Sequence, residues 1–418
     1  MPCRKAWKSR NSLLSNGFTM SEEYRAAEMA ARSSYGKLLA YLSSRTHDIA
    51  LAEDALAEAF TKALSHWKEN GIPNNPEAWL MTVAKNKITD RQRQLVRFPE
   101  EPEIEEEANM ESDSPALPDK RLELMMVCAH PAISADLHTP LMLQTVLGIE
   151  AKVIARLFMY PPAALAKRLV RAKAKVRDSG IPFQVPDPSQ LPSRCQTIYE
   201  AIYALHTYDW LDPNDTLGEE ALYLADLLVS LVPDDPEAKG LAALIAFGHA
   251  RRLARIHEQT LVPVEKQDMT LWDDSLSLYA QRKLKDAHAL NRVGRFQIEA
   301  AIQSVHQARK SSGITDWEAL SKLYPALIQF APSVGAKVAY SVVVAKHFGY
   351  EKGLNLVLDL ESEIGSGFQP LWATKAEFYR KLCQPKEAAD CYQKAISLST
   401  DTPTIRFLEN QLNSMRLN

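Results

Sequence analysis

The chain has 418 residues, a formal net charge of −3, 46% hydrophobic residues and 24% charged residues. This length predicts two or three domains, and the composition is typical of globular proteins, which excludes a fibrous or fully disordered chain. No apolar run approaches the roughly 20 residues that cross a bilayer, and none of the 5 Cys falls in a Cys-x-x-Cys pair. We therefore expect no membrane span, no disulfide framework and no zinc ribbon.

The first 20 residues are basic and contain no apolar segment of signal-peptide length. A second methionine, Met20, directly precedes the first helical pattern. We expect residues 1–20 to be a disordered leader, or translation to begin at Met20.

Residues 21–97 carry apolar side chains at spacings of three and four, which indicates helices. We expect one helix over about residues 21–45, a second over about 48–69 that Asp48 caps, and a third that begins near Pro76. The second helix turns acids outward, and these are Glu53, Asp54 and Glu58. By charge alone they form an ordinary solvated helix face.

The third helix pairs an apolar stripe with a basic outer face. Its inward side chains are Trp79, Leu80, Val83, Ala84 and Ile88. Its outward polar side chains are Lys85, Asn86, Lys87, Arg91, Arg93 and Arg97. Cations in such a row suit the backbone of an unpaired nucleic-acid strand, and a polar neighbour suits a base.

Residues 98–119 form an acidic linker. They hold seven Glu, two Asp and four Pro, with no Lys or Arg. This composition cannot bury a core, so we expect a flexible connection that also shields the basic faces on either side.

Residues 120–182 are helical and end in two short helices joined by a tight turn at residues 158–160. From residue 151 to residue 180 there are eight Lys or Arg against one acid, Asp178. The candidate DNA contacts on the second helix are Ala164, Lys167, Arg168, Arg171, Lys173 and Lys175. The shape predicts a helix-turn-helix that reads the major groove, while a basic helix that merely solubilises its domain is the alternative.

Residues 190–418 form a long helical tail. Its clearest unit is residues 372–398, in which small and aromatic residues fall at the spacings of a tetratricopeptide (TPR) repeat. Stacked repeats of this kind offer concave surfaces for peptides or partner proteins.

Taken in this order, the segments resemble a bacterial RNA polymerase sigma factor. Residues 21–97 resemble region 2 and residues 120–182 resemble region 4 of the sigma-70 superfamily. The compact two-domain form is the extracytoplasmic-function (ECF) type, and the tail is similar to a subgroup with a large TPR-like extension. The resemblance implies an all-α fold, with two small sigma domains followed by a helical-repeat domain.

The resemblance also implies a role for each helix in transcription initiation. Residues 48–67 look like the helix that binds core RNA polymerase, through its β′ and β subunits, and the implied contacts are Glu53, Asp54, Glu58 and Phe60. Residues 75–93 look like the helix that melts and reads the −10 element, with Lys85, Asn86, Lys87, Arg91 and Arg93 as contacts. Residues 154–177 look like the module that reads the −35 element of promoter DNA.

The sequence departs from this family pattern at two places. The turn at residues 158–160 lacks the common Gly, and Pro161 and Pro162 open the second helix where a more polar start is usual. The prolines suit a first helical turn but remove amide donors that could meet a phosphate. The first tail helix reads His-Thr-Tyr-Asp at residues 206–209, where the subgroup often has Asn-Glu-Gly-Tyr.

Enzyme motifs are absent from the sequence. There is no Walker loop, no Gly-rich dinucleotide turn, no Gly-x-Ser-x-Gly and no His-Glu-x-x-His. We expect no catalytic activity, no cofactor and no metal. His130 lies near Cys128, and these two residues are either a metal-binding pair or, as we expect, a structural histidine near a cysteine.

Two classes of function remain open on the residues alone. The first is a sigma factor whose tail acts in cis as a regulator or as a surface for a protein or peptide partner. The second is a TPR-type adaptor or scaffold protein with a DNA-binding front module. Basic residues are retained in both nucleic-acid helices, which favours the first. We expect a cytoplasmic, nucleoid-associated protein with no membrane partner.

Overall fold

The computed structural model describes residues 22–95, 118–211 and 217–416. The chain divides into two compact units, residues 1–201 and 202–418. The boundary between the units falls within a helix. It lies later in the chain than residue 190, at which the sequence predicts that the tail begins. The leader and residues 98–117 of the acidic linker lie outside the described residues, so their predicted flexibility stays a prediction.

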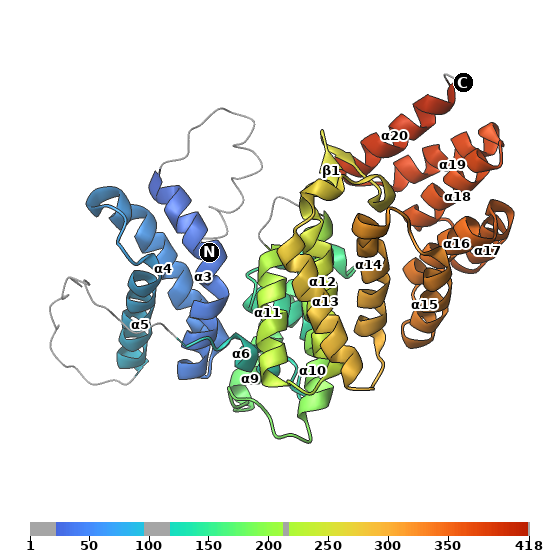
Figure 1. Ribbon diagram of the computed structural model, residues 1–418. Helices are drawn as coiled ribbons and strands as arrows, with labels where there is room; N and C mark the ends of the chain where they lie inside the picture. The colour runs from blue at the N-terminus through green and yellow to red at the C-terminus, as the bar shows by residue number, and fades with distance from the viewer. Residues whose placement is uncertain (1–21, 96–117, 212–216, 417–418) are drawn as a thin grey trace. The chain divides into compact units, whose positions relative to one another are not determined.

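The all-α prediction is confirmed, since helices make up almost all of the regular structure in the described ranges. Unit 1 holds the following helices (Figure 1): α3 Glu22–Thr46, α4 Ile49–Asn70, α5 Pro76–Leu95, α6 Arg121–Cys128, α7 Ala135–Thr145, α8 Ala151–Leu157, α9 Pro162–Asp178 and α10 Leu191–Leu211, which continues into unit 2. No helix in the described ranges combines the length and apolar content that a membrane span requires.

Helices α3, α4 and α5 form a bundle around the apolar stripe of α4. The Asp48 carboxylate caps α4 by accepting hydrogen bonds from the backbone N–H groups of Ala50 and Leu51, at 2.9 and 3.1 Å. Gly71, with φ of 84°, ends the helix. The core residues are Leu38, Leu39, Leu42, Ala52, Ala55, Leu56, Ala59, Phe60, Ala63, Trp67, Leu80, Met81, Ala84 and Ile88.

Helix α3 also packs against α6 and α7, which joins the two halves of unit 1. Gly36 makes this approach feasible, because a Cβ at that position would lie 1.9 Å from the carbonyl oxygen of Val146. Arg121, 6% exposed, donates to the Asp119 carboxylate beside this contact. The first half of α10 belongs to the same unit, since the Arg194 guanidinium donates to the carbonyl of Met126 at 3.2 Å.

Unit 2 is an array of helices in which consecutive helices pack against each other. Its helices after α10 are α11 Leu217–Leu231, α12 Pro236–Ala250, α13 Asp274–Ala289, α14 Arg295–Ser312, α15 Trp317–Phe330, α16 Val334–Phe348, α17 Tyr350–Ile364, α18 Gln369–Lys381, α19 Pro385–Leu398 and α20 Thr402–Arg416. Residues 372–398 form the hairpin of α18 and α19, with Ala376, Ala388 and Ala395 fully buried. Their assignment as a TPR repeat stays a prediction.

An irregular segment interrupts the array between α12 and α13. It contains the short helices η1 Arg252–Ala254, η2 Val264–Lys266 and η3 Met269–Leu271, and the strands β1 Ile256–His257 and β2 Thr260–Leu261. The strands are antiparallel, with Ile256 opposite Leu261. Helix α20 packs against β2, so the last helix meets the hairpin (Figure 1). This hairpin was not predictable from the sequence, because Glu258 and Gln259 adopt positive φ at turn positions where Gly is usual.

Buried basic side chains surround Arg251 in unit 2. Arg251 is 4% exposed, donates to the Gln303 side-chain oxygen and lies over the Trp272 ring. Burial, reinforced by the neighbouring arginines, lowers the pKa of His206 to about 4 and of His306 to about 4. Both rings are therefore neutral at pH 7.

Unit 2 is expected to lose stability as the pH falls from about 6.5 towards about 4. In the unfolded chain a histidine binds its proton near its ordinary pKa, whereas His206 and His306 in the folded unit bind theirs only near pH 4. The unfolded state thus takes up more protons, and each histidine contributes up to about 1.4 kcal/mol per pH unit. Urea unfolding at pH 7.5, 6 and 5 gives the slope of the free energy of unfolding against pH. Pulse proteolysis monitors the unfolding of unit 2 in these experiments. His306→Gln should flatten this slope, whereas the exposed control His288→Gln should not; equal slopes in all three proteins would contradict the assignment.

Candidate nucleic-acid interface

Four residues, 158–161, join helices α8 and α9, one more than the turn at residues 158–160 that the sequence predicts. The Tyr160 N–H donates to the Ala155 carbonyl at 2.8 Å, which folds the turn back onto α8. Met159 lies in the left-handed region with φ of 53°, at the turn that lacks the common Gly. Pro162 sits in the first turn of α9, where its missing N–H costs no helical hydrogen bond.

Met159→Gly is expected to stabilise unit 1 by about 0.5–1 kcal/mol. The Met159 side chain is 91% exposed, so its removal loses no packing, and glycine relieves the left-handed strain. Thermal unfolding or hydrogen exchange in α8 and α9 measures the gain. Asn291, with φ of 53° in unit 2, is the matched control, because asparagine tolerates this conformation and Asn291→Gly should gain less. A destabilised Met159→Gly protein would contradict the account.

Helix α9 is amphipathic, and its buried side anchors it in unit 1. The buried apolar side chains are Leu165, Leu169, Ala172 and Val176. The exposed side chains are Ala163, Ala164, Lys167, Val170, Arg171, Lys175 and Arg177. The first four turns thus present cations and small apolar groups, and no acid of α9 precedes Asp178.

Arg168 is held within its own domain. Its guanidinium pairs with Asp136 of α7 and lies 5.5 Å from the centre of the Tyr160 ring. The Tyr160 hydroxyl donates to the same Asp136 carboxylate at 3.2 Å. Hydrogen bonds from Ser134 and then Arg168 lower the pKa of Asp136. Through these contacts Arg168 holds the turn between α8 and α9 against α7. Arg168 can make its predicted contact with DNA only when its ion pair with Asp136 breaks.

Lys173 is buried, although the sequence predicts it as a contact for DNA. Its Nζ lies 2.5 and 2.6 Å from the two carboxylate oxygens of Glu53 on α4, and its side chain is only 7% exposed. Arg177 extends the contact, with Nη1 3.6 Å from the Asp48 carboxylate. In this arrangement Lys173 is not available to a phosphate, and Glu53 is not available to polymerase. The sequence spacing could have indicated this burial. Lys173 lies four residues after the buried Leu169, so both side chains lie on the same face of α9.

The other two predicted acids pair with predicted −10 contacts across α4 and α5. Glu58 lies 2.7 Å from Lys87, and Asp54 lies 3.5 Å from Arg91. All four side chains are between 44% and 71% exposed, so these pairs contribute little and exchange readily for other partners. Lys85, Asn86 and Arg93 are also exposed, with Lys85 over the Tyr41 ring at 5.1 Å.

The structure bears on two other sequence interpretations, those of Phe60 and of the pair Cys128 and His130. Phe60 is 6% exposed inside the core of the α3–α5 bundle, so its side chain packs within the fold, and its contact with polymerase stays a prediction. The Cys128 thiol contacts the Thr145 hydroxyl at 3.5 Å, and burial raises its pKa to about 12. The His130 Nδ1 accepts from the N–H of Ala132 at 3.1 Å. Among the described residues there is no group of three or more His, Cys, Asp or Glu that could hold a metal ion.

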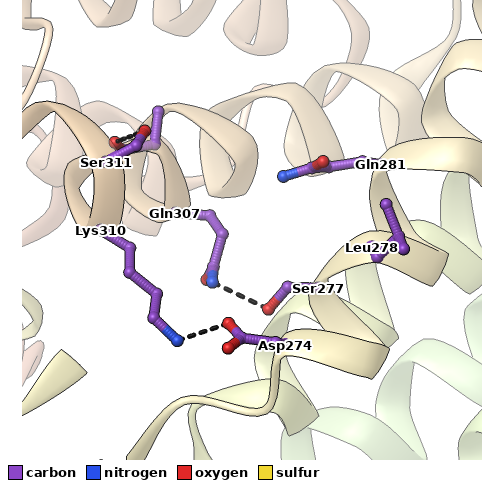
Figure 2. A pocket seen from close by; sticks show the side chains of 8 residues that line it. Asp274, Ser277, Leu278, Gln281, Gln307, Lys310 and Ser311 are labelled. Carbon is purple, nitrogen blue, oxygen red and sulfur yellow. Dashed lines mark hydrogen bonds and ion pairs between the residues drawn. The ribbon is translucent and has the colours of Figure 1, made fainter. Parts of the chain in front are cut away.

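A shallow hollow of about 240 Å³ lies between α13 and α14 in unit 2 (Figure 2). Two polar pairs cross it, Lys310 with Asp274 and Gln307 with Ser277, the latter at 2.8 Å. Ser277 in turn donates to the carbonyl of Asp273 at 2.6 Å. These pairs join helix to helix, so we assign the hollow a structural role.

The exposed cations of α5 belong to a segment that matches a known family. Residues 31–98 match the model of sigma-70 region 2, which covers most of α3 and all of α4 and α5. The chain is a member of the sigma-70 superfamily. Proteins of this superfamily are not enzymes, and their region 2 binds core RNA polymerase and promoter DNA in transcription initiation.

Two further comparisons concern the rest of this sigma-70 protein. Residues 194–288 match a family of unknown function, DUF6596, which spans α10 to α13. An uncharacterized protein of Rhizobium meliloti (strain 1021) is 32% identical over 396 residues, which cover 91% of this chain and 92% of the other. The two proteins therefore belong to one family, in which the sigma region and the tail occur together. No solved structure matches the chain.

Proposed function

We propose that this protein is a sigma factor of the extracytoplasmic-function type that directs core RNA polymerase to specific promoters. The observation that carries the proposal is the exposed row of cations on α5, within the segment that matches sigma-70 region 2. The row comprises Lys85, Lys87, Arg91 and Arg93. Such a row neutralises the phosphates of an unpaired strand, and the exposed Asn86 among them suits a base contact.

Helix α4 supplies the contact with polymerase, and helix α9 supplies the contact with the duplex. Asp54 and Glu58 are exposed acids that meet basic residues of the β′ subunit, while β lies near the second domain. Glu53 joins them only after Lys173 leaves it, so polymerase binding through Glu53 separates α9 from α4. The exposed first turns of α9 then meet the −35 element, with Lys175 on phosphate.

The tail, residues 202–418, acts in cis on this function as a regulator or as a docking surface for a protein or peptide. Its support is the family relationship, since the relative carries the same tail beside the same sigma region. The protein works in the cytoplasm at the nucleoid, where polymerase and promoters are. Run-off transcription with the full chain and with a chain ending at Ala201 tests the tail, because a cut near residue 185 would remove Arg194, Cys195 and Ile198 from unit 1. Equal activity of the two chains would refute a regulatory role.

Strand opening tests the role of α5 directly. Potassium permanganate footprinting of the holoenzyme on its own promoter detects unpaired thymines around the −10 element. Arg91→Ala with Arg93→Ala should reduce opening at least about tenfold, because two phosphate contacts are lost. The control is Arg282→Ala with Lys285→Ala, two exposed cations on α13. If the α5 variant opens DNA as well as the control does, the α5 assignment is wrong.

A further inference from the structure

The exposed face of α9 carries two parallel stripes of different chemistry. At 100° per residue, Ala163, Val170 and Ala174 fall within about 40° of each other on the helix, and Lys167, Arg171 and Lys175 follow along the next edge. Val170 is 67% exposed, whereas its neighbour Leu169 is 1% exposed. The β-branched apolar side chain of Val170 is thus exposed to solvent, while other apolar side chains of α9 form its contact with the core.

The pairings within unit 1 narrow the set of side chains that are free to read DNA. Arg168 is held by Asp136 and Tyr160, and Lys173 is buried against Glu53. The first turn is apolar as well, because Pro161, Pro162, Ala163 and Ala164 are all exposed. The N-terminal half of the reading face therefore offers two cations, Lys167 and Arg171, among small apolar groups.

Base edges in the major groove present one apolar group, the 5-methyl of thymine, and alanine-sized side chains contact it well. We propose that the apolar stripe of α9, with Val170 at its centre, reads thymine methyl groups in the −35 element. Lys167 and Arg171 read the neighbouring acceptors of guanine or hold phosphate. The inference rests on the proposed function, because it requires α9 to lie in the major groove.

A protein partner fits this stripe less well than DNA. Protein interfaces are dominated by clustered large anchors such as Trp, Tyr and Arg in desolvated pockets, and the stripe is one small side chain wide. Three cations border it, and the first acid on this face of α9 is Asp178, the last residue of the helix. Positive charge beside small apolar groups matches phosphates beside thymine methyls.

The test begins with duplexes that the full-length holoenzyme enriches from a random library. Each thymine of the enriched −35 element is replaced by uracil, which removes only the methyl group. At one or two positions the holoenzyme should bind about fourfold more weakly for each buried methyl lost. In Val170→Ala the same uracil substitution should have no further effect, because the methyl has already lost its partner. Val170→Thr, which keeps a methyl group, should retain the discrimination.

The matched control is Val293→Ala, since Val293 is an exposed valine (61%) in unit 2. Alanine is favourable in a helix, so Val170→Ala keeps α9 folded. Enrichment of no duplex at all would count against the proposed function itself. Enrichment of a duplex with no uracil sensitivity at any position would overturn the inference and leave the proposed function standing. Weaker polymerase association in Val170→Ala without any thymine dependence would assign the stripe to a protein contact and also overturn the inference.

Discussion

Lys167→Ala combined with Arg171→Ala is expected to reduce promoter-directed transcription about 100-fold or more. Both side chains are exposed on the face of α9 that the pairings of Arg168 and Lys173 leave available. Each contact with a guanine or a phosphate contributes about 1–3 kcal/mol to recognition of the correct site. Both substitutions place alanine in a helix, so the fold of unit 1 is retained.

The measurement is run-off transcription from the enriched promoter, with binding by the holoenzyme measured in parallel. The control removes two cations of the same kind from α13, by Arg282→Ala with Lys285→Ala. The control should lose less than about twofold, because general screening by salt affects both proteins equally. Equal losses in the two proteins would show that net charge matters and that the face of α9 does not.

Lys173→Ala is expected to destabilise the contact between α4 and α9 by about 2 kcal/mol. The substitution leaves the Glu53 carboxylate, whose side chain is 22% exposed, without its partner. The cost is below that of a fully buried pair, because water reaches part of this carboxylate. Lys173→Met with Glu53→Gln removes both charges and should cost clearly less than Lys173→Ala alone.

Hydrogen exchange in α4 and α9 of the full chain reports this contact locally. Arg177→Ala is the matched control, because the Arg177 side chain is 51% exposed and its Nη1 lies 3.6 Å from Asp48. The control should change protection much less than Lys173→Ala does, because a solvent-exposed ion pair contributes little. If Lys173→Ala behaves like the control, the pair with Glu53 does not hold the two halves of unit 1 together.

Local features of the fold were predictable because local signals encode them. Helix α4 begins after Asp48, whose side chain caps it, and ends before Gly71, which adopts a positive φ. Helix α5 begins at Pro76, whose fixed φ suits a first helical turn. The spacing of small and aromatic residues over 372–398 predicted the α18–α19 hairpin in the same way. Burial of the α4 stripe followed from its helical period, which placed Trp67 in the core.

Contacts between distant segments were not predictable from the sequence. The approach of α3 to α7 depends on the lack of a side chain at Gly36. The residues around Gly36 in the sequence do not indicate that Val146 is its neighbour in the fold. The same holds for Glu53, which looked like a solvated acid until its partner Lys173 was placed 2.5 Å away. Phe60 is a further case, because the resemblance that implied its contact with polymerase carried no information on its burial, and its side chain is 6% exposed.

The central claim is tested most directly by mixing the purified full-length protein with core RNA polymerase that lacks any other specificity subunit. Size-exclusion chromatography of the mixture, followed by run-off transcription on the enriched promoter, gives the result. The account predicts a stable complex that starts transcription at one fixed position, with core polymerase alone inactive there. Failure of the protein to associate with the polymerase, with no promoter-directed transcript, would contradict it.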